Sequence, residues 1–180
     1  MSEGAPIKRL PKQVEPRKLA YNQVKFSGVV KTEDLPRLAK AAQFTGDVRV
    51  CLEFRVDEQG RRIVKGDIEG NAKLECQRCL QAMDEQLIQA SVSVAIVWEE
   101  DEAKQLPRDI DPWIVGEDEA DFYALVEEEL LLNLPVAAYH DYVCIDEELL
   151  SHGSGEEQEV ERKNPFSVLA SMKNQTKRDK

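Results

Sequence analysis

Apolar side chains occupy every second position of the segment 48–56. They are Val48, Val50, Leu52, Phe54 and Val56. Successive side chains of a β-strand point to opposite faces, so this pattern predicts a strand with one face on a core and the other in solvent. A turn at residues 57–60 and a new apolar run from Ile63 predict an antiparallel hairpin. The chain must therefore build a sheet that is covered on one side only.

Further strands and two helices are predicted around this hairpin. Residues 24–29 and the long Val- and Ile-rich run 87–98 are typical of strands, and Thr32 can cap a short helix. Apolar side chains recur at helical spacing from Phe122 to Leu134, behind a capping Asp at 118 or 121. Strands come first and helices follow, which favours an α+β fold with a mainly antiparallel sheet. We expect a meander or a small distorted barrel, with a helix near 121–134 packed on one face.

The length of 180 residues and the apolar content of 42% allow one domain with a real core. We expect a flexible basic segment over 1–18 and a single α+β domain over 19–150. A polar, acidic linker over 151–163, a short helix over 164–173 and a basic tail over 174–180 would follow. The helix begins at an Asn-Pro-Phe sequence, in which Asn caps and Pro occupies the first turn.

Charge is spread very unevenly along the chain. Residues 1–25 and residues 161–180 each hold six basic and two acidic side chains, whereas residues 81–160 hold two basic and 22 acidic ones. The net charge of −11 therefore does not exclude nucleic-acid binding. Phosphate would contact the basic ends in a salt-dependent way, and the acidic half would suit a basic protein. Basic ends are also common as solubilising tails.

No membrane or export segment is expected. The longest apolar runs are too short to cross a bilayer, and prolines and cations interrupt the first residues where a signal peptide would need an apolar stretch. The sequence therefore predicts a cytoplasmic protein, in which structural disulfides are rare.

Two of the four cysteines, Cys76 and Cys79, form a C-x-x-C knuckle. Such a knuckle can be half of a zinc site, a redox dithiol, or a tight turn that tolerates cysteine. A zinc site needs two more ligands, and His140 and Cys144 are the best candidates by type and spacing. Cys51, within the alternating strand, is expected to be an ordinary thiol on the sheet.

The sequence shows little other chemistry. It has no phosphate-binding glycine loop and no nucleophile elbow. The acidic run 127–129 is expected to form the solvated face of the long helix. Several basic residues of the folded body could contact phosphate, and they lie along the second strand of the hairpin and in the knuckle. The alternative is that they pair across the strands with Asp67 and Glu69. These residues are Arg61, Arg62, Lys65, Lys73 and Arg78.

Four blocks together resemble the YceD family, the large ribosomal RNA subunit accumulation proteins. They are the Leu-Glu-Cys-Gln-Arg-Cys sequence at 74–79, the Glu-Glu-Glu-Leu-Leu-Leu-Asn-Leu-Pro sequence at 127–135, the pair His140 and Cys144, and the Asn-Pro-Phe-Ser-Val-Leu sequence at 164–169. The resemblance implies a cytoplasmic protein needed for synthesis, processing or stability of the large-subunit ribosomal RNA. It implies no enzymatic activity and no catalytic residue.

We therefore expect a non-catalytic ribosome biogenesis factor, with a thiol redox or zinc-dependent protein as the alternative. Its partner would be a ribosomal RNA precursor, a ribosomal protein or another assembly factor, and neither a membrane nor a small-molecule substrate is expected. Phe166, Leu169 and Lys173 join the five basic residues of the hairpin and knuckle as candidate contacts, and zinc is the possible cofactor.

Overall fold

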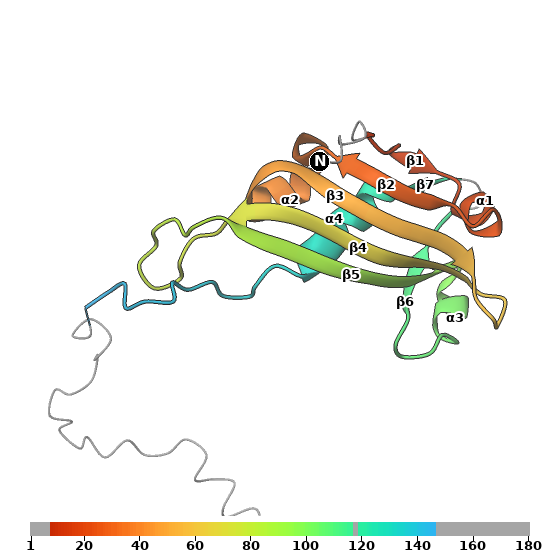
Figure 1. Cartoon of the computed structure of the whole chain (residues 1–180). Coiled ribbons are helices and arrows are strands. Elements are labelled where there is room, and N and C mark those ends of the chain that lie inside the picture. The colour runs from red at the N-terminus through yellow and green to blue at the C-terminus, as the bar shows by residue number, and fades with distance from the viewer. Residues whose placement is uncertain (1–7, 117–118, 147–180) are drawn as a thin grey trace, which may run out of the picture. The chain divides into compact units, whose positions relative to one another are not determined.

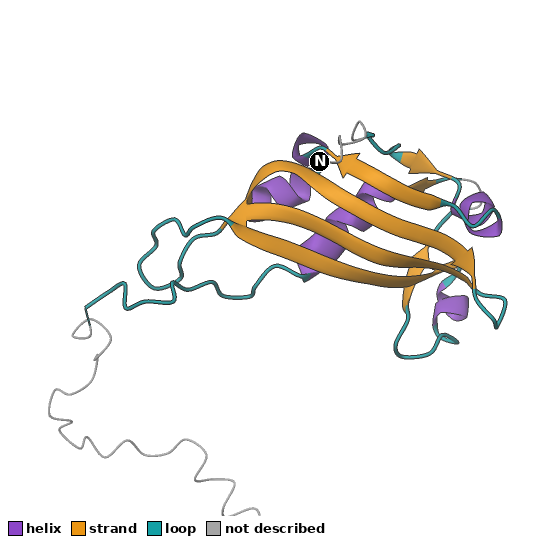
Figure 2. Cartoon of the chain, in the orientation of Figure 1, coloured by secondary structure: helices purple, strands orange, loops and turns teal. Residues whose placement is uncertain are grey.

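A computed structural model of the chain describes residues 8–116 and 119–146. It contains the following elements: β1 (Gln13–Val14), α1 (Pro16–Tyr21), β2 (Lys25–Val30), the 3-10 helix η1 (Thr32–Asp34), α2 (Pro36–Ala41), β3 (Gln43–Val56), β4 (Arg62–Lys73), β5 (Gln86–Val97), α3 (Glu100–Ala103), β6 (Asp111–Ile114), β7 (Ala120–Asp121) and α4 (Phe122–Leu132). Figure 2 distinguishes the strands, helices and loops of the chain by colour. The predicted linker, C-terminal helix and basic tail lie outside the described residues.

The main sheet has the strand order β2-β3-β4-β5-β6. Strands β2 to β5 form an antiparallel meander, and β6 joins the edge of β5 in parallel. The α+β class and the mainly antiparallel sheet are thus confirmed, and of the two predicted sheet forms the structure shows the open meander. The parallel strand β6 was not predicted, because Pro112 within it is unusual in a strand and is tolerated here at a sheet edge.

Helix α4 lies across one face of this sheet (Figure 1). The alternating residues of β3 point toward it, and four of the five, from Val48 to Phe54, are buried. The rings of Phe26, Phe54 and Phe122 meet at centroid separations of 5.2–6.3 Å, with edge-to-face or tilted geometry. Such pairs add to the burial of apolar area, so this aromatic cluster fastens α4 to the sheet.

The first turn of α4 is formed as predicted. The carboxylate of Asp121 accepts a hydrogen bond of 3.0 Å from the backbone N–H of Ala124, which satisfies one of the donors that every helix start leaves unpaired. The helix ends two residues earlier than predicted, at Leu132, with Asn133 as its cap.

The acidic run on α4 differs from the prediction at one position. Glu127 is only 6% exposed and is the one charged side chain buried among the described residues. Its Oε1 accepts hydrogen bonds from the backbone N–H groups of Arg37 (2.6 Å) and Leu38 (3.0 Å), at the start of α2. The predicted solvated face thus holds for Glu128, which is exposed, but was wrong for Glu127, because a carboxylate can satisfy the unpaired donors of a neighbouring helix.

Residues 8–18 were predicted to belong to a flexible segment, but in the structure they pack on the body. Leu10 and Val14 are buried in the core. The N–H of Leu10 donates to the carbonyl of Val29 (3.0 Å), and the N–H of Val29 donates to the carbonyl of Lys8 (2.9 Å). Gly28 permits this approach, since a Cβ there would lie 2.2 Å from the carbonyl oxygen of Lys8.

None of the helices in the described part of the chain is long and apolar enough to cross a bilayer.

Candidate metal centre

The C-x-x-C knuckle forms the connection between β4 and β5. Residues 75 and 82 pair as an isolated bridge, and the N–H of Cys76 donates to the carbonyl of Gln81 at 2.9 Å. The N–H of Leu80 returns to the carbonyl of Cys76 at 2.8 Å, with Leu80 in a left-handed conformation (φ +57°). These bonds close a tight turn, which leaves Cys76 fully buried and Cys79 half-buried.

A second segment, which follows α4, lies against the knuckle. The N–H of Gln77 donates to the carbonyl of Ala138 at 2.9 Å. The guanidinium of Arg78 donates through Nη2 to the carbonyl of His140 and, at 3.3 Å, to that of Tyr142. Because these donors hold the backbone on both sides of Asp141, Arg78 positions the imidazole of His140 rather than reaching into solvent.

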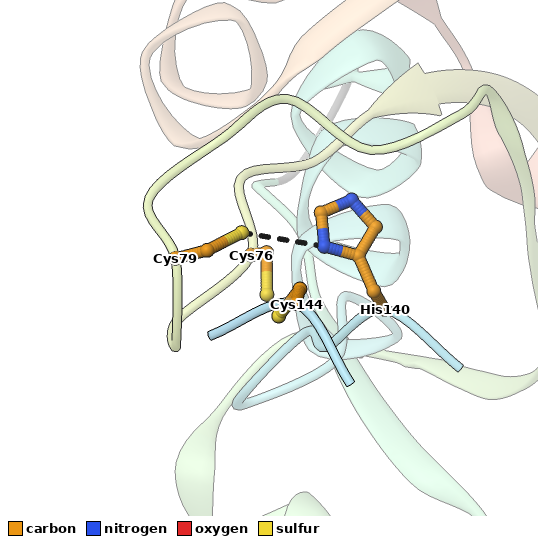
Figure 3. Close-up of side chains that lie close together, drawn as sticks. All are labelled: Cys76, Cys79, His140 and Cys144. Carbon is orange, nitrogen blue, oxygen red and sulfur yellow. Dashed lines mark hydrogen bonds between the residues drawn. The ribbon is translucent and has the colours of Figure 1, made fainter. Parts of the chain in front are cut away.

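The imidazole of His140 is fixed between two neighbours. Its ring stacks on that of Tyr142 with centroids 4.7 Å apart, and its Nδ1 lies 3.4 Å from Sγ of Cys79. In this contact Nδ1 donates or accepts according to the tautomer of His140. The contact is the dashed line in Figure 3.

The four residues singled out by type and spacing are brought together. Cys76, Cys79, His140 and Cys144 each offer one ligand atom, and these atoms all lie within 4.8 Å of one another. Figure 3 shows the two cysteines of the knuckle on one loop and His140 with Cys144 on the other. The fold thereby closes the gap of 60 residues that separates the two pairs in sequence.

This donor set fits zinc. Three thiolates and one imidazole are a common tetrahedral ligand set for structural Zn²⁺, in which bonds of about 2.0–2.3 Å place the donor atoms roughly 3.3–3.8 Å apart. The observed grouping needs only a small contraction to reach that geometry. Three thiolates exceed the charge of Zn²⁺ by one. Arg78 is part of the knuckle and donates to carbonyls of the other loop, so its cation can offset the excess.

The candidate phosphate contacts of the body do not form one patch. Arg61 and Arg62 lie at the start of β4, and Lys73 lies at its end, roughly 36 Å away for a strand of this length. Arg61 is half-buried and bonded to Asp57 at 2.6 Å, and Arg62 lies 5.2 Å from the ring of Trp98. Phe166, Leu169 and Lys173 lie outside the described residues.

The basic residues of the hairpin do not pair with Asp67 and Glu69 in the way that was given as the alternative to phosphate contact. Lys65 stands opposite Glu53 on β3 rather than beside Asp67 or Glu69. Glu69 is 3.9 Å from Arg49, and Asp67 accepts a hydrogen bond of 2.9 Å from Ser91. Lys65 and Lys73 remain exposed on the outer face of the sheet, so of the five body residues they are the most accessible to a partner.

Comparison with known proteins identifies the relatives of the chain. Residues 64–173 match the family described as "Large ribosomal RNA subunit accumulation protein YceD". This range includes both loops of the metal centre. The chain belongs to the YceD family. A relative from Haemophilus influenzae with the same description is 31% identical over 169 residues, which cover 92% of this chain and 97% of that protein. No solved structure matches the chain. The resemblance carried by the knuckle and the Asn-Pro-Phe sequence is thus confirmed.

Two contacts were not predicted from the sequence. Tyr142 supports the imidazole of His140, and its spacing of two residues from that histidine could have suggested a partner. Arg17 places its guanidinium 3.5 Å from the ring centroid of Trp98. No pattern in the sequence joins two residues so far apart, so that contact could not have been found.

Proposed function

We propose that this chain is a non-catalytic factor of ribosome biogenesis in the cytoplasm, which supports the synthesis, processing or stability of the large-subunit ribosomal RNA. The observation that carries the proposal is the similarity to the Haemophilus influenzae protein along nearly the whole of both chains, since that protein is described as a large ribosomal RNA subunit accumulation protein. The partner would be the RNA precursor itself, a ribosomal protein or another assembly factor.

The metal centre is part of this proposal as a structural site. Cys76, Cys79, His140 and Cys144 would hold Zn²⁺, which would fasten the knuckle to the segment after α4. The Cys79–His140 contact of 3.4 Å would also suit a nucleophile and its base. Two further sulfur atoms within 4.8 Å favour a metal instead.

A thiol redox role finds less support. Reactive thiols are accessible and are activated by a helix N-terminus or nearby cations. Cys76 is fully buried, and the knuckle is a turn between two strands rather than the start of a helix. The burial of one thiol of the pair therefore favours metal coordination over redox chemistry.

Contact with the precursor particle would use the basic residues at the two ends of the chain and the exposed lysines of β4. Phe166, Leu169 and Lys173 would add apolar and basic contacts. A phosphate-dominated contact loses affinity steeply as salt rises, whereas a protein partner held by apolar side chains persists. Sedimentation of a lysate at low and moderate salt distinguishes the two.

The test of the proposed function is depletion of the protein in its own cells. We expect the ratio of large-subunit to small-subunit ribosomal RNA to fall, and the wild-type chain to restore it. A variant in which Phe166 and Leu169 are replaced by Asp should restore it less well, whereas Cys51→Ser should restore it fully. An unchanged RNA ratio after complete depletion contradicts the proposal.

A further inference from the structure

A groove of about 400 Å³ lies between the edge strand β6 and helix α4, away from the metal centre. Its apolar lining consists of Val94, Pro112, Trp113, Ala124, Leu125 and Leu132. Val94 and Leu125 are buried and form the floor, whereas Leu132 is 72% exposed. The neighbouring Ile114 on β6 is 48% exposed. Apolar area thus remains in solvent beside the outer edge of the sheet, as at surfaces that bind another protein.

Three carboxylates line the same groove: Asp111 from β6, and Glu128 and Glu129 from α4. Glu128 is paired with Arg37 at 2.8 Å. For Asp111 and Glu129, residues 8–116 and 119–146 supply no cation within ion-pair distance. Burial, together with the charges of Asp111 and Glu128, raises the pKa of Glu129 above its ordinary value. Two acids beside an apolar floor therefore have no counter-charge in this part of the chain.

We infer that this groove binds an extended basic segment of a partner protein, which places an apolar side chain on the floor and Lys or Arg beside Asp111 and Glu129. The charge of the lining selects this occupant. A nucleic acid would bring phosphates against three carboxylates, and an uncharged apolar ligand would bury the acids without a partner.

Side chains rather than a continuous strand ladder would recognise the segment. Pro112 has no N–H, so β6 cannot offer a regular row of donors to an added strand. Specificity would come from the spacing between the apolar floor and the two acids. The inference rests on the proposed function in one respect: basic extended segments are typical of ribosomal proteins, the partner class proposed above.

The experiment uses the full chain and a synthetic labelled peptide, with arginines on both sides of a central pair of leucines. Two matched peptides replace the leucines by serine or the arginines by glutamine. Fluorescence anisotropy at about 0.15 M salt measures each affinity, since this salt screens weak long-range attraction. We expect both control peptides to bind at least about tenfold more weakly than the first.

Variants of the protein locate the binding surface. Asp111→Asn combined with Glu129→Gln should weaken binding about tenfold, and Leu132→Ser should weaken it severalfold. The matched control is Glu58→Gln combined with Asp84→Asn, which removes the same charge at two exposed positions outside the groove. It should stay within about twofold of wild type, because distant exposed charges are screened.

Three outcomes would overturn the inference. Equal losses for the groove variant and its control would show attraction to the acidic body as a whole. Equal binding of the serine peptide would show that the apolar floor is not used. Tighter binding after charge reversal of Arg162 and Lys163 would show that the chain's own basic end occupies the groove. None of these three outcomes changes the ratio of ribosomal RNAs that tests the proposed function.

Discussion

The body of the molecule and the loops of the metal centre are held together in different ways. In the body, Phe54 and Phe122 are fully buried, and α4 packs on strands that are 12 to 14 residues long. In the loops, Cys76 is fully buried, but Leu80, Val136 and Tyr142 are 66%, 104% and 63% exposed. The body can therefore be stable through apolar burial alone, whereas the loops depend on a few hydrogen bonds and on four donor atoms.

The largest expected effect lies in the body. Phe54→Ala removes the ring that touches both Phe26 and Phe122, and should lower the free energy of unfolding by about 3–5 kcal/mol. Chemical denaturation measures the change. Val56→Ala, on the same strand but 41% exposed, should cost less than about 1 kcal/mol. Similar losses for the two variants would contradict the assignment of the core.

The second effect lies in the loops. Purified without a metal-binding tag, the chain should carry about one zinc, and Cys79→Ser or His140→Ala should lose it. A metal ion present at about one hundred times its dissociation constant stabilises the folded chain by about 2.7 kcal/mol. The free energy of unfolding should therefore fall by this amount when the ion is lost. Elemental analysis and thermal unfolding measure both quantities.

Cys51→Ser is the matched control for this prediction, since that thiol is exposed on the outer face of the sheet. It should change neither metal content nor stability. If Cys79→Ser has an effect and His140→Ala has none, a redox dithiol explains the knuckle better. Zinc content near zero in the wild type would remove the structural site altogether.

A smaller effect is expected where the body joins α2. Glu127→Ala leaves the N–H groups of Arg37 and Leu38 without their acceptor in a buried place, and should cost about 1–3 kcal/mol. Glu128→Ala, one residue along, removes an exposed ion pair with Arg37 that is worth at most about 1 kcal/mol. Denaturation of the two variants side by side tests this contrast, and equal losses would refute it.

The smallest effect concerns Glu129. Its pKa is raised in the folded chain, so the folded state binds this proton more tightly than the unfolded state does. The associated stability is present below the ordinary glutamate pKa and is lost as pH rises through the raised value. Glu129→Gln should therefore raise the melting temperature slightly at neutral pH, and this gain should disappear on acidification.

Exposed Glu58→Gln serves as the reference and should change the melting temperature little at either pH. A lower melting temperature for Glu129→Gln at neutral pH would show that its charge is compensated, and would also weaken the case for the acidic groove.

Local patterns predicted most of the sheet and the donor set. The alternation of residues 48–56 reports which face is buried, and spacing with chemical type was enough to select Cys76, Cys79, His140 and Cys144. Pairs of distant residues left no such pattern. The buried acceptor role of Glu127 depends on α2, which lies about 90 residues earlier in the chain.

Two other features show the same limit. The docking of Leu10 and Val14 depends on space beside Gly28 and on the pairing of β1 with β7. The basic residues of the hairpin looked like one patch because they are close in sequence. A twelve-residue strand separates them in space, so that closeness in sequence was misleading.

The position of α4 near the end of the described chain has a consequence for synthesis on the ribosome. Strands β2 to β5 leave the exit tunnel in the order in which they pair, so each hairpin can form as it emerges. The part of their apolar face that α4 covers nevertheless stays in solvent until Phe122–Leu132 is made. Strand β1 waits as long, because it pairs with β7, and the hydroxyl of Tyr123 donates to the carbonyl of Leu10 at 2.7 Å. The nascent chain therefore exposes apolar sheet surface between the synthesis of β5 and that of α4, and β1 reaches its final place only after β7 has been made.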